Sequence, residues 1–455
     1  MLFSLLFITS GAIILTMVLT VSLAAVTIIG MTASVLIKPY VKIKNINLGI
    51  YWVICLLGAL AMLLTGCISF ESAISGITAE TSVNPLKILT LFLSMTLLSV
   101  YLGDAGFFDY VADALFRKTK GSQLKLFLAL YFVVAVLTVF TSNDVIILTF
   151  TPPICIFAKK AKISPVPYLV GEFIAANTWS MMLIVGNPTN VYLAQSASIS
   201  FFEYFSVMYL PTICGGVVSL VVLLLLFRKD LKAPLQSSLP QKSIASPHGN
   251  VKLEKPTMIA AIVHLSACII LLAISDLIGA EMWLICFTLA ASLTVFDIFY
   301  DAIHYHSLSP LLKSVKKEPF ELIPFVLSMF IIVLSLKECG FTDLLGNILI
   351  RGDEFDGVSF GLISAAAANL LNNIPMSVLF ERIVDGTSRA AVFGAIIGSN
   401  IGAYLTPVGA LAGIMWNKIL SVRGVKLPFI KFVEYGFIVA IPTIIASTLA
   451  LLLTV

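Results

Sequence analysis

TSNDVIILT, residues 141–149, places four consecutive polar side chains between two apolar stretches. The preceding stretch, LFLALYFVVAVLTVF (126–140), and the following one, FTPPICIFA (150–158), are each shorter than the roughly 20 apolar residues that cross a bilayer as a helix. Two short apolar arms joined by a polar break are typical of a re-entrant helical hairpin, which enters and leaves the membrane on one side. We therefore expect residues 124–158 to form such a hairpin, with residues 141–144 at its tip.

The composition indicates that the whole chain is embedded in a membrane. Of its 455 residues 59% are hydrophobic and only 11% are charged, and the mean hydropathy is +1.05, whereas soluble domains contain about 25% charged residues. The seven cysteines form no CxxC pair and no cluster with histidine, so we interpret them as buried apolar side chains and expect no metal or other cofactor. The net charge of +4 gives no reason to expect a nucleic-acid partner. The sequence predicts a multi-pass protein of the plasma or inner cell membrane, surrounded by the lipid bilayer.

Apolar stretches long enough to be full spans recur along the chain. A second apolar stretch with a polar break in its middle, residues 357–384, is predicted to be another re-entrant hairpin. The first span is longer than a bilayer requires, so we expect it to be tilted or interrupted, and a second crossing within residues 1–36 stays open. The sequence thus predicts an all-α polytopic membrane protein of about ten transmembrane helices and two hairpins. The predicted spans are 4–36, 48–69, 86–105, 166–194, 205–227, 257–275, 282–299, 319–336, 390–417 and 432–454.

The distribution of basic residues predicts the topology. Residues 1–227 and 257–455 show the same order of elements with opposite starting sides, so we predict two inverted repeats joined by a polar cytoplasmic linker at 228–256. Inverted repeats with interrupted helices are typical of secondary transporters, in which the breaks mark a binding site near the membrane midplane. Six alternate loops contain 23 of the 28 lysines and arginines, which places them in the cytoplasm by the positive-inside rule and both termini outside. These loops are 37–47, 117–125, 159–162, 228–256, 300–318 and 418–431.

Four polar breaks make up the candidate substrate and ion site. In each half of the chain one break is a hairpin tip and the other interrupts a long span. Broken helices expose N–H groups at one end and carbonyl groups at the other, which favour anions and cations respectively. A single Asn or Pro in a membrane helix more often only packs or kinks it, but four breaks at matching positions indicate a binding site. The predicted site residues are Ser142, Asn143, Asp144, Gly186, Asn187, Pro188, Thr189, Asn190, Asn372, Asn373, Ser399, Asn400, Thr406 and Pro407.

Ionisable residues at membrane depth are the candidates for ion coupling. Asp144, at the first hairpin tip, could hold Na⁺ together with Ser142 and Asn143, or carry a proton; alternatively it could only cap the helix that follows. Glu172 is a second coupling candidate, although an interfacial carboxylate is an equal interpretation. For His264 a hydrogen bond between helices is favoured over a proton relay.

Four stretches of the sequence resemble the Ion Transporter superfamily: SND followed by an apolar stretch and TPP, then GNPTN, NNIP and SNIGAYLTPVGALAGIMW. The chain is similar over nearly its whole length to arsenite permeases and to citrate and dicarboxylate carriers, with 106–121 and 406–416 most similar to the arsenite permeases. The resemblance implies a transport domain of two hairpins and two interrupted helices, which moves as an elevator in a scaffold of outer helices, and a homodimer. Arsenite permeases carry acidic residues in both interrupted spans, where this chain has Asn177 and Asn400.

The resemblance also implies how the site is divided. Residues 142–143 with 186–190 would form one half of the ion and substrate site, and residues 372–373 with 398–409 the other. The expected function is an ion-coupled secondary transporter of a small anion or oxyanion-like solute by alternating access, with Na⁺ or H⁺ as the coupling ion.

Other functions remain as alternatives to this expectation. A sodium/proton antiporter without an organic substrate would need little more than the carboxylate of Asp144, and a sodium-coupled di- or tricarboxylate symporter would use the same breaks. A membrane-embedded enzyme is disfavoured because the spans contain no HExxH motif and no His/Asp/Glu metal cluster. The GxxxxGK[ST] motif of a nucleotide-driven pump is also missing, so we expect no enzymatic activity.

Overall fold

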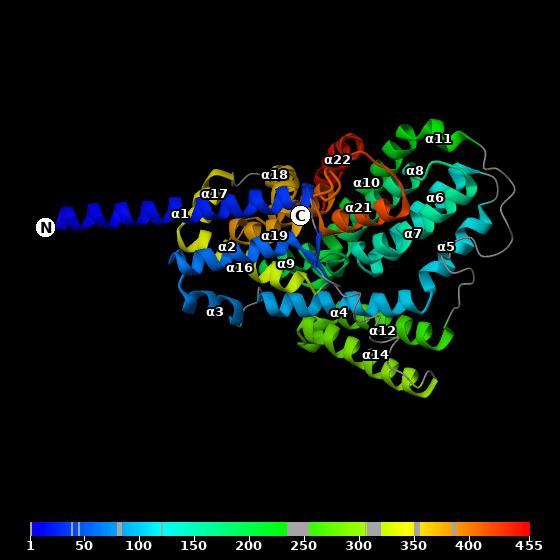
Figure 1. The fold of residues 1–455 in the computed structure, drawn as a ribbon, viewed down its shortest axis with the longest axis horizontal. Helices are drawn as coiled ribbons and strands as arrows, with labels where there is room; N and C mark the ends of the chain where they lie inside the picture. The colour runs from blue at the N-terminus through cyan, green and yellow to red at the C-terminus, as the bar shows by residue number, and fades with distance from the viewer. Residues whose placement is uncertain are drawn as a thin grey trace.

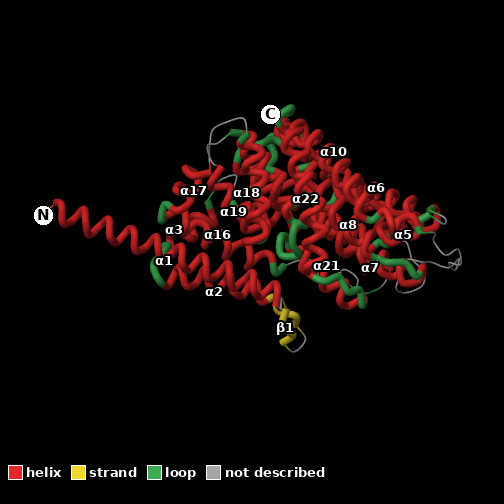
Figure 2. The backbone as a smooth tube through the Cα atoms, turned by 90° about the horizontal axis from the view of Figure 1, so that it is seen from above, coloured by secondary structure: helices red, strands yellow, loops and turns green. Residues whose placement is uncertain are grey.

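The computed structural model describes most of the chain. Nearly all of the described residues are helical, which confirms the all-α fold (Figure 2). The predicted linker 228–256 lies outside the described residues except at its two ends. The described residues are 2–37, 40–43, 46–79, 84–119, 122–233, 254–304, 306, 320–349, 355–384 and 388–455.

The longer helices follow the same order in each half of the chain. The first half contains α1 (Leu2–Ile37), β1 (Tyr40–Ile43), β2 (Ile46–Gly49), α2 (Ile50–Leu64), α3 (Phe70–Thr78), α4 (Pro85–Asp104), α5 (Phe107–Lys118), α6 (Gln123–Phe140), α7 (Asn143–Ala161), α8 (Val166–Trp179), η1 (Ser180–Met182), η2 (Ile184–Gly186), α9 (Pro188–Ser196), α10 (Phe201–Leu226) and α11 (Arg228–Lys232). The second half contains α12 (Lys255–Ala273), α13 (Ser275–Ile278), α14 (Met282–His304), α16 (Leu322–Glu338), α17 (Phe341–Leu349), α18 (Asp356–Leu371), α19 (Asn373–Val384), α20 (Arg389–Gly402), α21 (Leu411–Arg423) and α22 (Phe429–Leu451). Three helices (α1, α2, α4 or α12, α14, α16) come first, then a helix pair around a hairpin tip (α6 and α7 or α18 and α19), then an interrupted helix (α8 and α9 or α20 and α21) and a final long helix (α10 or α22).

Seven of the described helices are long and apolar enough to cross a membrane, namely residues Ile14–Val35 within α1 and the helices α4, α6, α10, α12, α14 and α22. The pair α16 and α17 together forms an eighth, bent by 80°. The predicted span 48–69 contains a shorter helix than expected, because α2 ends at Leu64. The predicted spans 166–194 and 390–417 are both interrupted, as expected.

The N-terminal span is one uninterrupted helix. At 36 residues α1 is about 54 Å long, so of the two expected alternatives the structure excludes the interruption, leaves the tilt as a prediction, and gives no second crossing within the described residues. Its N-terminal part extends beyond the other helices (Figure 1). The chain then forms a two-stranded antiparallel sheet, in which Tyr40 pairs with Gly49; this element was not expected.

Helices α6 and α7 form an antiparallel pair around α8 at the position of the predicted hairpin 124–158; that this hairpin is re-entrant stays a prediction. Near the start of α8, Tyr168 donates a hydrogen bond to Gln123 Oε1 at the start of α6 (3.0 Å), and near its end Ala176 O accepts one from Thr138 (3.4 Å). The other arm, α7, begins at the tip and ends just before α8 begins. Both outer ends of the hairpin therefore lie at the start of α8. The arms are 18 and 19 residues long, which is longer than the short arms expected.

Helices α18 and α19 form the second hairpin, whose first arm packs backbone to backbone on α20. A Cβ atom added to Gly394 would collide with Gly357 O, and one added to Gly398 would collide with Gly361 O. A Cβ on Gly402 would lie 2.7 Å from Cα of Ala365. These small residues recur every four positions on both helices, so they allow close contact along the whole pair.

Each half of the chain packs into the other. The third long helix of the first half, α4, lies along α12 and α14, and its counterpart α16 lies along α1 and α2 (Figure 1). The second arm of the first hairpin, α7, packs on α21, and its counterpart α19 packs on α9. Neither half could bury its apolar surface alone.

Segments predicted to lie on the same face contact one another. On the predicted cytoplasmic face, Gln123 donates to Ala233 O (3.0 Å) and the backbone N–H of Glu254 donates to Ala105 O (3.1 Å). On the opposite face, Lys87 forms an ion pair with Glu281 at 2.6 Å. These contacts agree with the two-sided arrangement of loops; the assignment of one side to the cytoplasm stays a prediction.

Candidate functional site

The first interrupted helix breaks earlier than predicted. Helix α8 gives way to the short 3₁₀ turns η1 and η2, which begin at Ser180. Asn187 then caps α9 by accepting a hydrogen bond from the N–H of Thr189 (3.2 Å), and Pro188 occupies the first helical position, where its missing N–H costs nothing. Gly186 is required because a Cβ there would collide with Ser180 O.

Asn400, in the last turn of α20, joins the two interrupted helices. Its Oδ1 accepts hydrogen bonds from Ser180 Oγ and Asn187 Nδ2, each at 3.0 Å, and its Nδ2 donates to Asn190 Oδ1 at 2.6 Å. Beside it, the hydroxyls of Ser399 and Thr189 lie 3.0 Å apart. These predicted site residues therefore hydrogen-bond to one another across some 210 positions of sequence, so they fix the geometry of the site and leave few groups free to bind a solute.

The second hairpin tip is hydrogen-bonded to the second break. Asn369 Nδ2 donates to Gly402 O (2.8 Å), and its Oδ1 accepts from the hydroxyl of Thr406 (2.7 Å). Asn372 Nδ2 donates to Val408 O at 2.9 Å. Asn372 has φ 74° and ψ 153°, a conformation that costs a residue with a side chain about 1–3 kcal/mol. The bond to Val408 holds the tip in this strained conformation.

The first hairpin tip presents polar groups that have no partner among the residues the structure describes. Asn177 Nδ2 donates to Phe173 O (2.8 Å), so Asn177 Oδ1 must accept from Asn143 Nδ2 (3.0 Å), and this orientation leaves Asn143 Oδ1 free. Ser142 Oγ is also buried without a partner. Although Ser142 is the N-cap residue of α7, its side chain makes no capping bond.

Both hairpin tips contain unpartnered atoms. Among the described residues, Ser142 and Asn143 are the one pair of sequence neighbours with a buried, unpartnered side-chain atom each, and Asn373 Oδ1 is a third such atom at the start of α19. An unsatisfied buried polar group costs about 1–3 kcal/mol, so a bound ion or solute that supplied the missing partner would gain that free energy.

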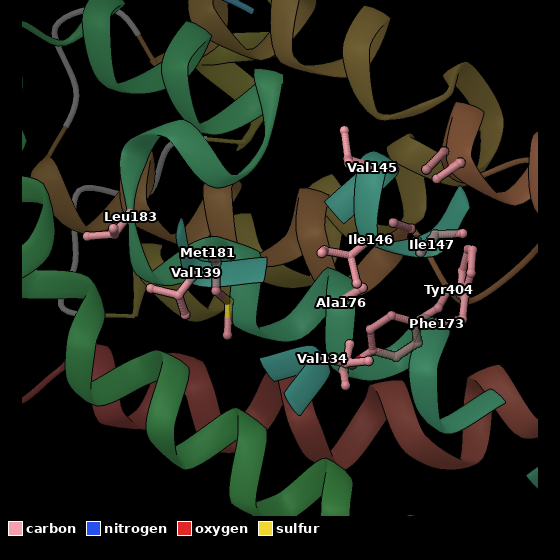
Figure 3. Packing of buried hydrophobic residues seen from close by; sticks show 14 of the residues in the cluster. Val134, Val139, Val145, Ile146, Ile147, Phe173, Ala176, Met181, Leu183 and Tyr404 are labelled. Carbon is pink, nitrogen blue, oxygen red and sulfur yellow. The ribbon is translucent and has the colours of Figure 1, made fainter. Parts of the chain in front are cut away.

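Apolar side chains form a shell along the helices that carry the first tip. Figure 3 shows Ile146 of α7 beside Ala176 of α8, with further apolar side chains of α6, α8 and the first break around them. Such a shell excludes bulk water and strengthens electrostatic interactions inside it. The labelled residues are Val134, Val139, Val145, Ile146, Ile147, Phe173, Ala176, Met181, Leu183 and Tyr404.

The two predicted coupling carboxylates occupy different places. Asp144 lies in the first turn of α7 beside the tip and is not the capping residue, because the helix already begins at Asn143. Glu172 is fully buried within the protein, and Thr151 Oγ1 lies 3.0 and 3.1 Å from its two oxygens. The same hydroxyl donates to Ile147 O at 2.5 Å. The indole N–H of Trp416 also interacts with this carboxylate. The Thr151 proton cannot satisfy Ile147 O and both carboxylate oxygens at once, so a proton taken up by Glu172 would relieve this competition.

His264 forms the predicted bond between helices. Its Nε2 lies 3.2 Å from Ser292 Oγ, so α12 and α14 are joined there.

Sequence reasoning missed some of the residues that hold the breaks in place. Ser180 and Asn369 each make two or more side-chain bonds at a break, yet Ser180 precedes the GNPTN cluster by several apolar residues and Asn369 is the one polar residue in the last turns of α18. The signal that could have found Asn369 is its place one helical turn before Asn373.

A hydrolase-like pattern in the second hairpin has a structural explanation. GVSFG (357–361) matches the GxSxG sequence of a nucleophile elbow, which requires a sharp strand-to-helix turn. Here the five residues lie within α18, and both glycines face α20. The pattern therefore reflects helix packing.

Comparison with known proteins agrees with this architecture. A sequence profile of citrate transporters matches residues 50–393. The chain belongs to the citrate transporter family. As a member of that family with several apolar helices, it is a multi-pass membrane transport protein of the cell membrane.

Curated relatives of this citrate transporter family member carry other names. The arsenical pump membrane protein of Escherichia coli K12 is 25% identical over 375 residues, which cover 80% of this chain and 85% of the relative. The putative arsenical pump membrane protein of Bacillus subtilis is 26% identical over 415 residues, covering 87% and 92%. These matches confirm the resemblance to arsenite permeases.

A solved structure shares the fold. MtrF of Neisseria gonorrhoeae, described as illuminating a class of antimetabolite efflux pumps, matches with a TM-score of 0.57 at 12% identity, over 97% of this chain and 95% of that one.

Proposed function

We propose that the protein is an ion-coupled secondary active transporter of a small anion or oxyanion-like solute. The observation that carries the proposal is the first hairpin tip, where Ser142 Oγ and Asn143 Oδ1 are buried without partners at the uncapped start of α7. The family membership and the names of the relatives support transport of an anion such as citrate or an arsenical.

The tip offers groups for both charges. The first N–H groups of α7 have no helical acceptor and no side-chain cap, so together with the Ser142 hydroxyl they suit an anion. The Asn143 amide oxygen and the Asp144 carboxylate suit Na⁺, which prefers oxygen ligands. A cation and an anion bound about 4 Å apart attract by about 4 kcal/mol at an effective dielectric constant near 20. Each would therefore raise the affinity for the other by up to about 1,000-fold.

Coupling by a proton is the second candidate, and the surroundings of Glu172 favour it. This carboxyl group is fully buried, competes with a backbone carbonyl for the Thr151 hydroxyl proton, and also interacts with the indole N–H of Trp416. It lies between α7 and α8, within the same hairpin unit as the tip. Protonation there would remove a buried charge from the unit before it moves.

The movement we propose is alternating access. The two hairpins and two interrupted helices form one unit through the Asn400 bonds and the close α18–α20 contact. The scaffold consists of the other long helices, and an elevator movement and a homodimer follow from the family resemblance. No catalytic step is part of this mechanism.

The test is a thermal-shift series on the purified full-length protein, with citrate, succinate, sulfate, arsenite and antimonite added singly at several Na⁺ concentrations and pH values. A ligand at 100 times its Kd stabilises the folded state by about 2.7 kcal/mol. A solute effect that requires Na⁺ supports sodium symport, and one that requires low pH supports proton coupling. A response to Na⁺ and pH without any solute effect would replace the proposal by sodium/proton antiport, and no response to any addition would overturn it.

The tip residues are tested in the same assay. Asp144→Asn should abolish the dependence on the coupling ion while changing the free energy of unfolding without ligand by no more than about 1 kcal/mol, because Asp144 interacts mainly with the α7 dipole. Ser142→Ala should weaken the solute effect. Ser447→Ala is the matched control, since its hydroxyl is also buried without a partner but lies on α22. Equal ion dependence in wild type and Asp144→Asn would refute the role of the tip carboxylate.

A further inference from the structure

A cavity of about 380 Å³ lies beside the second break, and no residue of the first hairpin tip is among the described residues that line it. Its walls come from Val35 of α1, Tyr40 of β1 and the exposed turns of α21, and its floor is formed by Pro407 and Val408. The cavity therefore lies between the first helix pair and the unit that contains the second break. Its lining also includes Ile414, Asn417, Lys418, Ser421 and Phe429.

Among the described residues that line the cavity, Lys418 is the one cationic side chain. Its Nζ lies 4.1 Å from the centroid of the Tyr40 ring, and among the described residues no carboxylate lies within ion-pair distance of it. Burial, with a smaller contribution from Glu321, raises the pKa of Tyr40 to about 12, so its phenol is neutral at physiological pH. The ring contact is worth about 0.5–1 kcal/mol at an exposed site, which a bound anion can replace.

The floor of the cavity is the backbone that holds the second hairpin tip. Val408 O accepts the bond from Asn372, and the neighbouring Gly409 O accepts from the N–H of Asn373 (3.0 Å). Val408 is buried and Lys418 is exposed, so the cavity extends from solvent to the break. A solute in it would lie against the strained tip of α19.

We propose that this cavity is a vestibule for the anionic solute, in which Lys418 makes the first charged contact. The inference rests on the proposed function for the nature of the solute, a small carboxylate or oxyanion. The lysine attracts the anion from the predicted cytoplasmic side and holds it beside the second break. A single cation at the mouth of a low-dielectric cleft acts mainly on the rate of association, and salt weakens its effect.

The contact between Lys418 and Tyr40 also joins the two parts that would move against each other. Tyr40 belongs to the sheet that follows α1, and Lys418 to α21 of the proposed moving unit. An anion that takes the place of the ring releases this link when it binds. Arrival of solute and release of the unit then depend on the same side chain.

The test measures the electrostatic potential of the cavity without requiring the natural solute. Ser421→Cys places a thiol on the wall, and the purified full-length protein in detergent is labelled with an anionic and with a cationic methanethiosulfonate reagent. The seven native cysteines are controlled by the same measurement without the added cysteine. We expect the anionic reagent to be favoured, and the ratio of the two rates to fall roughly three- to tenfold in Lys418→Gln as the local positive charge is lost.

Matched variants decide the outcome. Lys426→Gln removes an exposed basic residue of the following loop that does not line the cavity, and should leave the ratio unchanged; Lys418→Arg should preserve it. If the ratio of anionic to cationic labelling rates is the same with Lys418 and with Lys418→Gln, the vestibule proposal is refuted. In a second arm, citrate, arsenite and sulfate are tested for slowing the labelling in the presence of Na⁺. The ratio of labelling rates could depend on Lys418 while no solute slows the labelling. That result would confirm that the cavity is electropositive but contradict its use by these solutes, so the vestibule and the proposed transport function are tested separately.

Discussion

Replacing Asn400 by alanine tests the connection between the two halves of the site. The substitution removes three side-chain bonds to the first break, with Ser180, Asn187 and Asn190. Ser180 Oγ keeps its bond to Asn177 O, but Asn187 Nδ2 and Asn190 Oδ1 are left in a buried site without any other side-chain or backbone partner.

The expected cost follows from those two groups. Each unsatisfied buried group costs about 1–3 kcal/mol, which gives about 2–6 kcal/mol in total. Hydrogen bonds between membrane helices average only about 0.6 kcal/mol, so three of them give about 2 kcal/mol. We therefore expect Asn400→Ala to lower the free energy of unfolding by about 3 kcal/mol.

Equilibrium unfolding in detergent micelles provides the measurement, with Ser399→Ala as a neighbouring control that loses the hydroxyl contact with Thr189 and should cost about 1 kcal/mol. Asn400 and Asn190 share one hydrogen bond of 2.6 Å. In a double-mutant cycle, the loss of stability in the Asn400→Ala/Asn190→Ala variant should therefore be smaller than the sum of the two single losses by at least about 0.5 kcal/mol. Strictly additive effects, or a cost of Asn400→Ala no larger than that of Ser399→Ala, would refute the central role of Asn400.

Three further substitutions test other features of the fold. Asn372→Gly should be more stable than Asn372→Ala by about 1 kcal/mol in the same unfolding assay, because both lose the bond to Val408 O but only glycine relieves the strain at φ 74°. Lys87 hydrogen-bonds to Glu281 and lowers the pKa of that carboxyl group below its ordinary value of 4.5. The pair therefore stabilises the folded state fully above pH 4.5, and this stabilisation is lost as the pH falls through the lowered pKa. Glu281→Gln should remove this acid dependence and cost under about 1 kcal/mol at pH 7, because the pair is exposed; an unchanged acid limb of the stability profile would contradict the pairing. Gly398→Ala should cost about 1–3 kcal/mol or prevent folding, because its Cβ collides with α18, whereas Gly30→Ala, with one neighbour at 3.4 Å, should be tolerated; equal expression and stability of the two would contradict the packing of α18 on α20.

The positions of the breaks were predictable from the sequence because polar residues interrupt apolar stretches there. Residues 141–144 and 371–375 lie at the two hairpin tips, and the two interrupted spans are where Gly, Pro and Asn cluster. The start of the first break was missed because Ser180 follows Trp179 without any proline or glycine, and a 3₁₀ turn has no marker of its own in sequence.

The partners of the site residues were not predictable. Asn187 and Asn190 look identical in sequence to residues that bind a solute, yet both are occupied by Asn400. Pairing across such a separation depends on the approach of α20 to the first break, which follows from tertiary packing and not from any local pattern. The unpartnered atoms of Ser142 and Asn143 could likewise be recognised only after every neighbouring donor and acceptor had been placed.

The mutual packing of the two halves has a consequence for how the chain is made. When the ribosome has completed α7, the helix that covers it, α21, is still some 250 residues from synthesis. The same holds for α4, whose neighbours α12 and α14 follow only after the linker. Insertion of the first half must therefore precede its full packing, and α7, which already contacts α5 and α8, lacks its contact with α21 until the last helices are made. Biogenesis of such a protein is governed by contacts distant in sequence, which are slow to form, so a cell must protect the half-made chain for most of its synthesis.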